Sequence, residues 1–420
     1  MKSKLRLLVL GLGICALGFS NPEDPKNGDQ YRGPNRDGVY ENDKKIKLWQ
    51  SDAPREVWKT PIGDGFSAIV FSGKLMYTMF AGDGEDSTEY IAAFDPKSAR
   101  EKWRYAVGKM FSDPFGNGPR ATPTIDGNMI YALGSMGELH ALNKKNGKLA
   151  WKASFVEKFE SRVPRRGFTT SPLIDGDNVL VIVGGGEGEA LASFNKKTGE
   201  LAWTAHDGRP SHSSPIQAEI DGVKHNFFTS VRVVDKKPVH EALSVSSDGK
   251  VLWSTPSLPA VIAMPLHIPP DKFFVSGSMD EGCAVYQVVQ EGGDMKVKEV
   301  WANRSMKNHF NSSLYYDGHI YGFSKSTFKC IDAETGEQKW AKRGFGKGNV
   351  IIGGGYMIVV SDKGKLAVLE INPEEYVEVK SAQVLNGKSW TTPTYVNGKI
   401  YLRNRTEMAC FDLEENAPAQ

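Results

Sequence analysis

The sequence predicts an all-β fold in which one antiparallel sheet unit is repeated around a closed ring. Three observations lead to this prediction: a tryptophan that recurs at a nearly constant spacing, a turn motif that precedes it, and two chain ends that each hold part of one further repeat. The composition agrees, since 44 of the 420 residues are glycine and 10% are aromatic. Such a composition suits many short, half-buried strands joined by tight turns.

Tryptophan recurs at a spacing that is typical of a structural repeat. The six steps from Trp58 to Trp340 span 282 residues and average 47, which falls in the range of repeats that build a ring of sheets. We expect each of these side chains to lie on an outer strand and to dock one sheet against the next. The positions are Trp58, Trp103, Trp151, Trp203, Trp253, Trp301 and Trp340.

A turn motif precedes most of these tryptophans. Its fullest forms are "ALNKKNGKLAW" (141–151) and "SFNKKTGELAW" (193–203). Asp or Asn can bond backbone N–H groups of the turn, and glycine accepts the positive φ that closes it. Upstream phrases such as "TPTYVNGKIY" (392–401) indicate two alternating strands around an Asp-Gly or Asn-Gly turn. Each repeat therefore supplies about four short strands, and only residues 154–161 are weakly helical in pattern.

The two ends of the chain complete each other. Residues 389–416 contain three strands of a repeat without a tryptophan strand, whereas "REVWKT" (55–60) is a tryptophan strand with no repeat before it. Pairing them would remove exposed sheet edges. The predicted fold is therefore an all-β, eight-bladed β-propeller of four-stranded antiparallel blades, closed by an N-terminal strand. The blades are expected to begin near Phe66, Ala121, Thr170, Ser213, Ala263, Asn311, Val350 and Thr391.

The N-terminus has the pattern of a signal peptide. Three basic residues precede the apolar run 7–19, which is too short to span a bilayer. Cleavage after Gly18 or after Ser20 fits equally, and lipid attachment at Cys15 is the competing interpretation. We expect an exported protein, periplasmic or extracellular. Its expected organisation is a signal peptide (1–20), an N-terminal extension (21–54), a single propeller (55–416) and a tail (417–420).

Charge and cysteine usage argue against several classes of function. The 52 basic residues nearly balance the 50 acidic ones, so no global field favours nucleic acid or an anionic membrane. Cys283, Cys330 and Cys410 remain after the leader, and the last two fall where other repeats carry Ala or Ser. We expect small buried residues rather than a disulfide framework. A monomer with no transmembrane segment and no nucleic-acid partner is predicted.

The repeat resembles the pyrroloquinoline-quinone (PQQ) enzyme repeat, with its "AxDxxTGxxxW" docking tryptophan. The resemblance covers about residues 55–413. The phrases "QYRGPNRDGV" (30–39) and "GNGPRATP" (116–123) look like those of secreted bacterial PQQ-like propeller proteins of undefined function. The resemblance implies an eight-bladed propeller, and it does not by itself imply the quinone.

Quinoprotein dehydrogenases of this fold hold PQQ over a disulfide between adjacent cysteines. A Ca²⁺ ion is bound by Glu, Asn and Asp, and a catalytic Asp lies beside it. This chain has no adjacent cysteines, and none of its motifs matches the Glu-Asn-Asp set. No catalytic residue, metal ligand or cofactor is therefore predicted. A PQQ- and Ca-dependent quinoprotein dehydrogenase with an unrecognised site stays open as the alternative.

The candidate binding residues follow from their place in the ring. In a propeller the strand that opens each repeat lines the central channel, and the loops before it form one mouth, where ligands usually bind. The residues at these places are Arg120, Arg166, Phe168, His212, His267, His309, Asn311 and Trp390. Their mixture of cations, imidazoles and aromatic rings suits an anionic or sugar-like ligand or a peptide. For each residue, a role in the wall is the competing interpretation. We expect an exported, non-catalytic scaffold of the cell envelope that binds a protein or small ligand.

Overall fold

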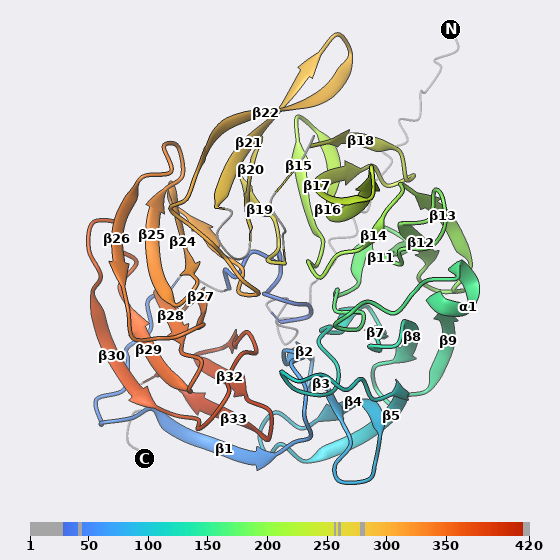
Figure 1. Cartoon of the computed structure of the whole chain (residues 1–420). Coiled ribbons are helices and arrows are strands. Elements are labelled where there is room, and N and C mark those ends of the chain that lie inside the picture. Colours follow the sequence, from blue (N-terminus) through green and yellow to red (C-terminus); the bar gives the residue numbers. More distant parts are fainter. Residues whose placement is uncertain (1–27, 41–43, 256–257, 259–261, 278–281, 415–420) are drawn as a thin grey trace, which may run out of the picture.

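The chain forms an eight-bladed β-propeller, as the sequence predicts (Figure 1). The computed structural model describes residues 28–40, 44–255, 258, 262–277 and 282–414. Within these residues one short helix, α1 (Phe155–Phe159), interrupts the strands. The predicted signal peptide and C-terminal tail lie outside the described residues, as does Cys15.

Consecutive strands of a blade pair antiparallel, and the chain runs from the central channel to the rim. The strands of blades 1 to 4 are β2 (Val70–Ser72), β3 (Leu75–Ala81), β4 (Thr88–Phe94), β5 (Glu101–Lys109), β6 (Thr124–Asp126), β7 (Met129–Leu133), β8 (Glu138–Asn143), β9 (Leu149–Ser154), β10 (Leu173–Asp175), β11 (Asn178–Ile182), β12 (Leu191–Asn195), β13 (Leu201–Ala205), β14 (Arg209–Pro210), β15 (Ile216–Ile220), β16 (Val223–Val234), β17 (Lys237–Val245) and β18 (Val251–Ser254). Those of blades 5 to 8 are β19 (Leu266–Ile268), β20 (Lys272–Ser276), β21 (Cys283–Glu291), β22 (Asp294–Asn303), β23 (Leu314–Tyr316), β24 (His319–Ser324), β25 (Thr327–Asp332), β26 (Gln338–Lys342), β27 (Asn349–Gly353), β28 (Tyr356–Val360), β29 (Lys365–Leu369), β30 (Glu378–Gln383), β31 (Thr394–Val396), β32 (Lys399–Arg403), β33 (Glu407–Asp412) and β1 (Arg55–Pro61).

The N-terminal strand closes the ring, which confirms the prediction from the two chain ends. Strand β1 is the outer strand of blade 8 and pairs antiparallel with β33, with Trp58 opposite Cys410. Figure 1 shows these strands side by side, blue against red. The guanidinium of Arg55 also lies 2.6 Å from the carboxylate of Asp412 across the pair. Residues more than 350 positions apart therefore share one sheet.

Two blades depart from the simple repeat. Blade 4 has five strands, because β14 and β15 both pair with the long strand β16. In blade 5 the hairpin of β21 and β22 projects beyond the ring (Figure 1). Blade 7 has an outer strand, β30, although this segment carries no tryptophan.

The apolar core is divided among the junctions between neighbouring blades. The buried hydrophobic residues fall into eight clusters, and each cluster draws on two adjacent blades. The three described cysteines are free thiols, and their buried side chains belong to these clusters. Stability is therefore distributed around the ring, and no single blade holds a core of its own.

Six of the seven repeat tryptophans bond the turn of the next blade, whereas Trp253 donates to His225 of its own blade. The indole Nε1 of Trp103 donates to the carbonyl of Lys144 at 3.1 Å. A Cβ added at Gly147, in the same turn, would lie 2.5 Å from the Trp103 ring. Gly147 also has φ of +69°, so glycine is needed both for the turn and for the close approach of the indole. This geometry explains why glycine and tryptophan recur together.

The junction between blades 7 and 8 is built differently. Lys380 faces Val368 on β29, at the position where other blades place tryptophan opposite the third strand. A residue of the extension, Trp49, is instead 3% exposed and packs with the cluster that includes Phe411 and Leu413. Its backbone N–H donates to the carbonyl of Leu413 at 3.2 Å. The extension therefore supplies the indole that blade 7 lacks.

The extension also fills one end of the central channel (Figure 1). Its contacts reach around the ring. Phe71 of blade 1 donates its N–H to the carbonyl of Gly28, and Ile125 of blade 2 does so to Asp29. Arg32 donates to the carbonyl of Ser313, just before blade 6. Further contacts reach blades 3, 7 and 8. Residues 28–40 thus form a plug held by six of the eight blades.

Candidate functional site

The open mouth of the channel gathers aromatic side chains from four separate inter-blade connections. Phe66, Phe115, Phe310 and Trp390 precede the innermost strands of blades 1, 2, 6 and 8. The ring centroid of Trp390 lies 4.7 Å from that of Phe310. The centroids of Phe66 and Phe115 lie 6.1 and 6.2 Å from it. Because Phe115 is 47% exposed, the group presents apolar surface to solvent.

Cationic side chains lie over these rings. Lys388 Nζ is 4.4 Å from the Trp390 centroid, and Lys347 Nζ is 5.9 Å from the same ring. The Arg166 guanidinium lies 4.6 Å from the centroid of Phe115. A cation within about 6 Å of an aromatic face is attracted by the ring quadrupole. We call these seven residues (Phe66, Phe115, Arg166, Phe310, Lys347, Lys388 and Trp390) the mouth cluster.

A buried network supports the loop that carries Phe115. Asp113 Oδ2 accepts a hydrogen bond from Arg166 Nη1 at 2.6 Å, and Arg120 Nη2 lies 3.4 Å from Asp113 Oδ1. Arg120 also donates to the carbonyls of Gly116 and Gly118. Burial of Asp113 acts to raise its pKa, but the hydrogen bond from Arg166 and the other charges outweigh burial and lower it. The loop is therefore fixed by charge-assisted contacts.

The imidazoles at this end respond to the positive charge around them. Burial lowers the pKa of His309, and the charges of Lys347 and Arg166 lower it further. Burial, Arg120 and Arg166 together lower the pKa of His212 to about 4. Both rings are therefore neutral near pH 7. The charged groups that shift the pKa of these two histidines are cationic.

The structure brings five of the eight candidate binding residues together at the open mouth: Arg120, Arg166, His212, His309 and Trp390. The other three are not exposed at the open mouth. Phe168 is 2% exposed and packs against Phe155 in the core between blades 2 and 3. Asn311 is buried and donates to the carbonyl of Lys347. His267 lines a cavity at the opposite end of the channel.

Five mouth-cluster residues were not among the predicted binding residues: Phe66, Phe115, Phe310, Lys347 and Lys388. Each lies on a different connection and belongs to no motif, so only closure of the ring brings them together. One local signal was present, because the segments 309–310 and 388–390 place a cation or imidazole beside an aromatic ring. Such pairs, read at equivalent places before each inner strand, would have indicated the cluster.

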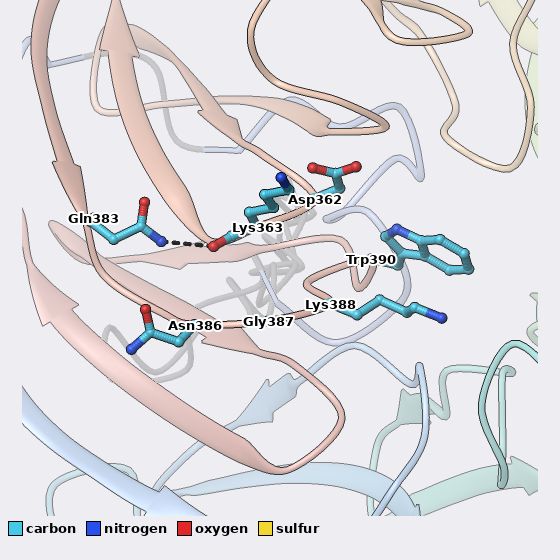
Figure 2. Close-up of a pocket in the computed structure, with 7 residues that line it drawn as sticks. All are labelled: Asp362, Lys363, Gln383, Asn386, Gly387, Lys388 and Trp390. Atoms are coloured by element: carbon cyan, nitrogen blue, oxygen red, sulfur yellow. Dashed lines mark hydrogen bonds between the residues drawn. The ribbon is translucent and has the colours of Figure 1, made fainter.

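A hollow adjoins the mouth cluster beside blade 7. It has a volume of about 560 Å³ and is lined by Asp362, Lys363, Gln383, Asn386, Gly387, Lys388 and Trp390. Figure 2 shows Trp390 and Lys388 pointing to one side, and Gln383 and Asn386 to the other. Amide, carboxylate and ammonium groups therefore continue outward from the aromatic surface of Trp390, so a ligand seated there would meet both apolar and polar contacts.

Three carboxylates near the mouth are already engaged. Asp64 forms an ion pair with Arg405. Glu89 is buried, and its two oxygens accept the backbone N–H groups of Phe111 and Ser135. Asp113 binds Arg166, as described above. These carboxylates are therefore occupied in holding loops, and none is oriented as a free metal ligand.

Neither a cluster of three or more acidic, imidazole or thiol groups nor a pair of adjacent cysteines occurs among the described residues. No group of three or more His, Cys, Asp or Glu side chains in the described part of the chain could hold a metal ion. The free thiols Cys283, Cys330 and Cys410 lie in three different blades, on β21, β25 and β33. A disulfide between adjacent cysteines therefore has no counterpart among them.

Comparison with known proteins now places this propeller. The family model described as outer membrane protein assembly factor BamB matches residues 87–342, more than half of the chain. The chain belongs to this family. No curated protein matches the sequence significantly. Among the described residues, no helix has the length and apolar character needed to cross a bilayer.

Solved structures of BamB-like and quinoprotein propellers resemble the fold. BamB from Moraxella catarrhalis aligns with a TM-score of 0.61 and 14% identity, covering 86% of this chain and 100% of that one. The quinohemoprotein alcohol dehydrogenase ADHIIG from Pseudomonas putida HK5 aligns with a TM-score of 0.62 and 12% identity, covering 94% and 81%. At such identities the likeness shows the fold alone. Together with the family match, it confirms the predicted kinship with PQQ-like propellers.

Proposed function

We propose that this protein is an exported, non-catalytic scaffold of the cell envelope that binds a partner at its open mouth. The proposal rests on the mouth cluster, where exposed and half-buried aromatic rings lie under cations. Aromatic side chains flanked by cations contribute much of the affinity of protein interfaces. The most suitable partner is a polypeptide segment that carries acidic and aromatic side chains. A small anionic or sugar-like ligand is the narrower form of the same proposal.

The rigidity of the mouth supports a binding role. Arg120 anchors the loop of Phe115 through two backbone carbonyls, and Asp64 ties that loop to blade 8. Lys388 Nζ also donates to the carbonyl of Phe115 at 2.9 Å, which joins the connections before blades 2 and 8. Because these loops are held before any partner arrives, little conformational entropy is lost on binding.

The family match supports a place in the cell envelope. The matching family model is described as an outer membrane protein assembly factor, and the basic and apolar pattern of residues 1–19 is that of an export signal. Binding of a protein partner also agrees with that description. Periplasmic or extracellular location, and the absence of a lipid at Cys15, remain parts of the proposal. Mass spectrometry of the exported protein would test both, since a lipid-modified Cys15 would contradict it.

Binding at the mouth can be tested with a defined polymer. We expect a random copolymer of glutamate and tyrosine to bind the immobilised mature protein, and we expect 0.5 M NaCl to weaken that binding. Trp390→Ala should weaken it by about tenfold or more, because a central aromatic anchor is lost. Lys342→Ala is the matched control, since Lys342 Nζ lies 4.8 Å over the Tyr376 ring at the rim. Equal loss in both variants, or no binding at all, would contradict the proposal.

The alternative function is a quinoprotein dehydrogenase, which the fold of solved alcohol dehydrogenases keeps open. It can be tested by a dye-linked assay with primary alcohols after PQQ and Ca²⁺ are added, together with the absorbance of any retained quinone. We expect neither turnover nor retained quinone, because the carboxylates at the mouth are engaged in ion pairs and backbone contacts. Turnover that depends on both PQQ and Ca²⁺ would contradict the scaffold proposal and support the dehydrogenase.

A further inference from the structure

A second cavity lies at the plugged end of the channel. Its volume is about 460 Å³, and it separates the N-terminal plug from the inner strands of blades 2 to 6. The plug contributes Gln30, Asn35 and Arg36, and the strands contribute Gln217 and His267. None of its lining residues belongs to the mouth cluster. A volume of this size is within the range of pockets that hold small molecules.

Arg36 is a charged side chain of this cavity whose hydrogen-bonding groups are not all paired. Its side chain is 2% exposed, and Nη2 donates to the carbonyl of Ser171 at 3.0 Å. The buried Nε and Nη1 atoms have no hydrogen-bond partner among the described residues. Leaving donors of a buried guanidinium unpaired is costly. Because Arg36 lines the cavity and its guanidinium is incompletely paired, the side chain is suited to an oxyanion.

The neighbouring acidic groups leave Arg36 charged and available. Burial lowers its pKa to about 9, with Tyr31 and Asp29 acting in the opposite direction, so the guanidinium is protonated at neutral pH. Asp126, on the cavity wall, is held by Lys196 Nζ at 2.8 Å. Asp37 accepts the backbone N–H of Val39 through Oδ1. Two of the three carboxylates that line the cavity are thus bound to other parts of the chain, whereas the third, Asp29, acts on the charge of Arg36.

The remaining wall is suited to a carbon skeleton. Apolar side chains from three blades face the cavity: Leu173, Ile174, Ile216 and Leu266. Gln217 lies among them, with its Nε2 donating to Asn226 Oδ1. A ligand here would place a charged end on Arg36 and apolar atoms against the strands. Inorganic ions would use the first feature, and organic acids would use both.

We propose that the cavity binds a small organic anion whose carboxylate or phosphate oxygens pair with the guanidinium of Arg36. The site is separate from the open mouth and does not depend on the proposed scaffold function. It gives a role to the phrase "QYRGPNRDGV" (30–39), which carries Arg36 and the turns that place it in the channel. The ligand would join the plug to the blades.

Calorimetric titration of the full mature chain tests this proposal. The probes are succinate, methylphosphonate and inorganic phosphate, with 1,4-butanediol as the uncharged control. We expect succinate or methylphosphonate to bind with one equivalent per chain, butanediol not to bind, and phosphate to bind more weakly than the organic anion. Arg36→Lys should weaken binding by about tenfold or more, because lysine lacks the planar set of donors.

Arg32→Lys is the matched control. Arg32 lies in the same plug, is also 2% exposed and donates to the carbonyl of Ser313, but it does not line the cavity. Its change should leave affinity within about twofold of wild type, provided that the melting curve shows a folded protein. Equal weakening in both arginine variants would assign Arg36 a structural role and overturn the proposal.

A variant that leaves Arg36 in place guards against loss of folding. Ile174→Phe places a larger side chain of β10 in the cavity. It should reduce affinity by about tenfold or more, because the side chain would exclude the ligand. Wild-type affinity in this variant would show that the anion binds elsewhere. Failure of every organic anion to bind at millimolar concentration would also overturn the proposal. Neither result would bear on the proposal that a partner binds at the mouth cluster.

Discussion

The two ends of the central channel are built on the same repeat but differ in what covers them. At the open mouth, short connections leave Phe115 47% exposed and set cations over Trp390. At the other end, residues 28–40 cross the channel and bury Arg32 and Arg36 to 2% exposure. The blades share one antiparallel plan, apart from the fifth strand of blade 4. The difference teaches that the repeat makes the wall, whereas the segments outside the repeat give each end its chemistry.

The plug depends on close backbone approach. Arg32 and Arg36 both have positive φ, near +64° and +60°, and Gly38 lies where a Cβ would come 2.5 Å from Arg32 Nη2. Glycine is therefore required at position 38 for the guanidinium to reach the carbonyl of Ser313. The open mouth has no such segment over it among the described residues, and its aromatic rings stay accessible.

The largest effect is expected when the closing strand is removed with the plug. A chain lacking residues 1–60 loses the β1 to β33 ladder, the Trp58 contact and the extension. It would expose the edge of β33 and open the plugged end. We expect no cooperative unfolding transition by circular dichroism. A chain that begins at residue 28 is the control, and a deletion variant that melts like this control would show that the ring does not need its N-terminal strand.

Trp49 of the extension is expected to contribute more to the free energy of unfolding than the repeat tryptophan Trp203. Trp49 is 3% exposed at the junction of blades 7 and 8, whereas Trp203 keeps part of its surface in solvent. Trp49→Ala should lower the free energy of unfolding by about 3 to 5 kcal/mol. Trp203→Ala should lower it by less. Urea denaturation measures both, and a neutral Trp49→Ala would mean that the extension only rests on the ring.

Replacing one cationic side chain at each end should show which end contributes more to stability. Arg32→Ala removes a buried cation that bonds two carbonyls and is expected to cost about 2 to 3 kcal/mol. Lys388→Ala at the open mouth should cost less than about 1 kcal/mol, since exposed cations contribute little to stability. Thermal melts of the two variants check this order. The reverse order would identify the open mouth as the structural end.

The smallest effect concerns pH. Burial and the charges of Arg120 and Arg166 lower the pKa of His212 to about 4. The unfolded chain, with a histidine pKa near 6.5, binds more protons between these values, so stability should fall as pH decreases from about 6.5 to 4. His212→Gln should reduce that slope, as followed by the denaturation midpoint. Salt should raise the pKa of His212 more than that of His225, whose pKa is lowered chiefly by burial and also by His267.

Most of the fold followed from the sequence because the repeat records local geometry. The Asx and glycine turns, the tryptophan spacing and the unmatched strand at residues 55–60 each correspond to a contact in the structure. The second inner strand of blade 4 and the role of Trp49 were not predictable in this way. Trp49 has no motif around it, and its partners Phe411 and Leu413 come from the far end of the chain.

The candidate site was only partly predictable. Position in the ring indicated Arg166 and Trp390, which the structure places in the mouth cluster. It also suggested His267, which lies on an inner strand and lines the cavity at the other end. Position along a strand sets the end of the channel that a side chain faces, and the sequence pattern gave only the strand. The aromatic partners on other loops depended on ring closure.

Hydrogen exchange of the mature protein, with and without the glutamate–tyrosine copolymer, tests the central claim most directly. Amides of the connections exchange through local opening, even where hydrogen bonds hold them, and a bound partner slows that opening. We expect slower exchange in residues 110–118 and 386–391, with no change in the plug at residues 28–40. Slower exchange confined to the projecting hairpin of β21 and β22, with both mouth segments unchanged, would contradict the assignment of binding to the open mouth.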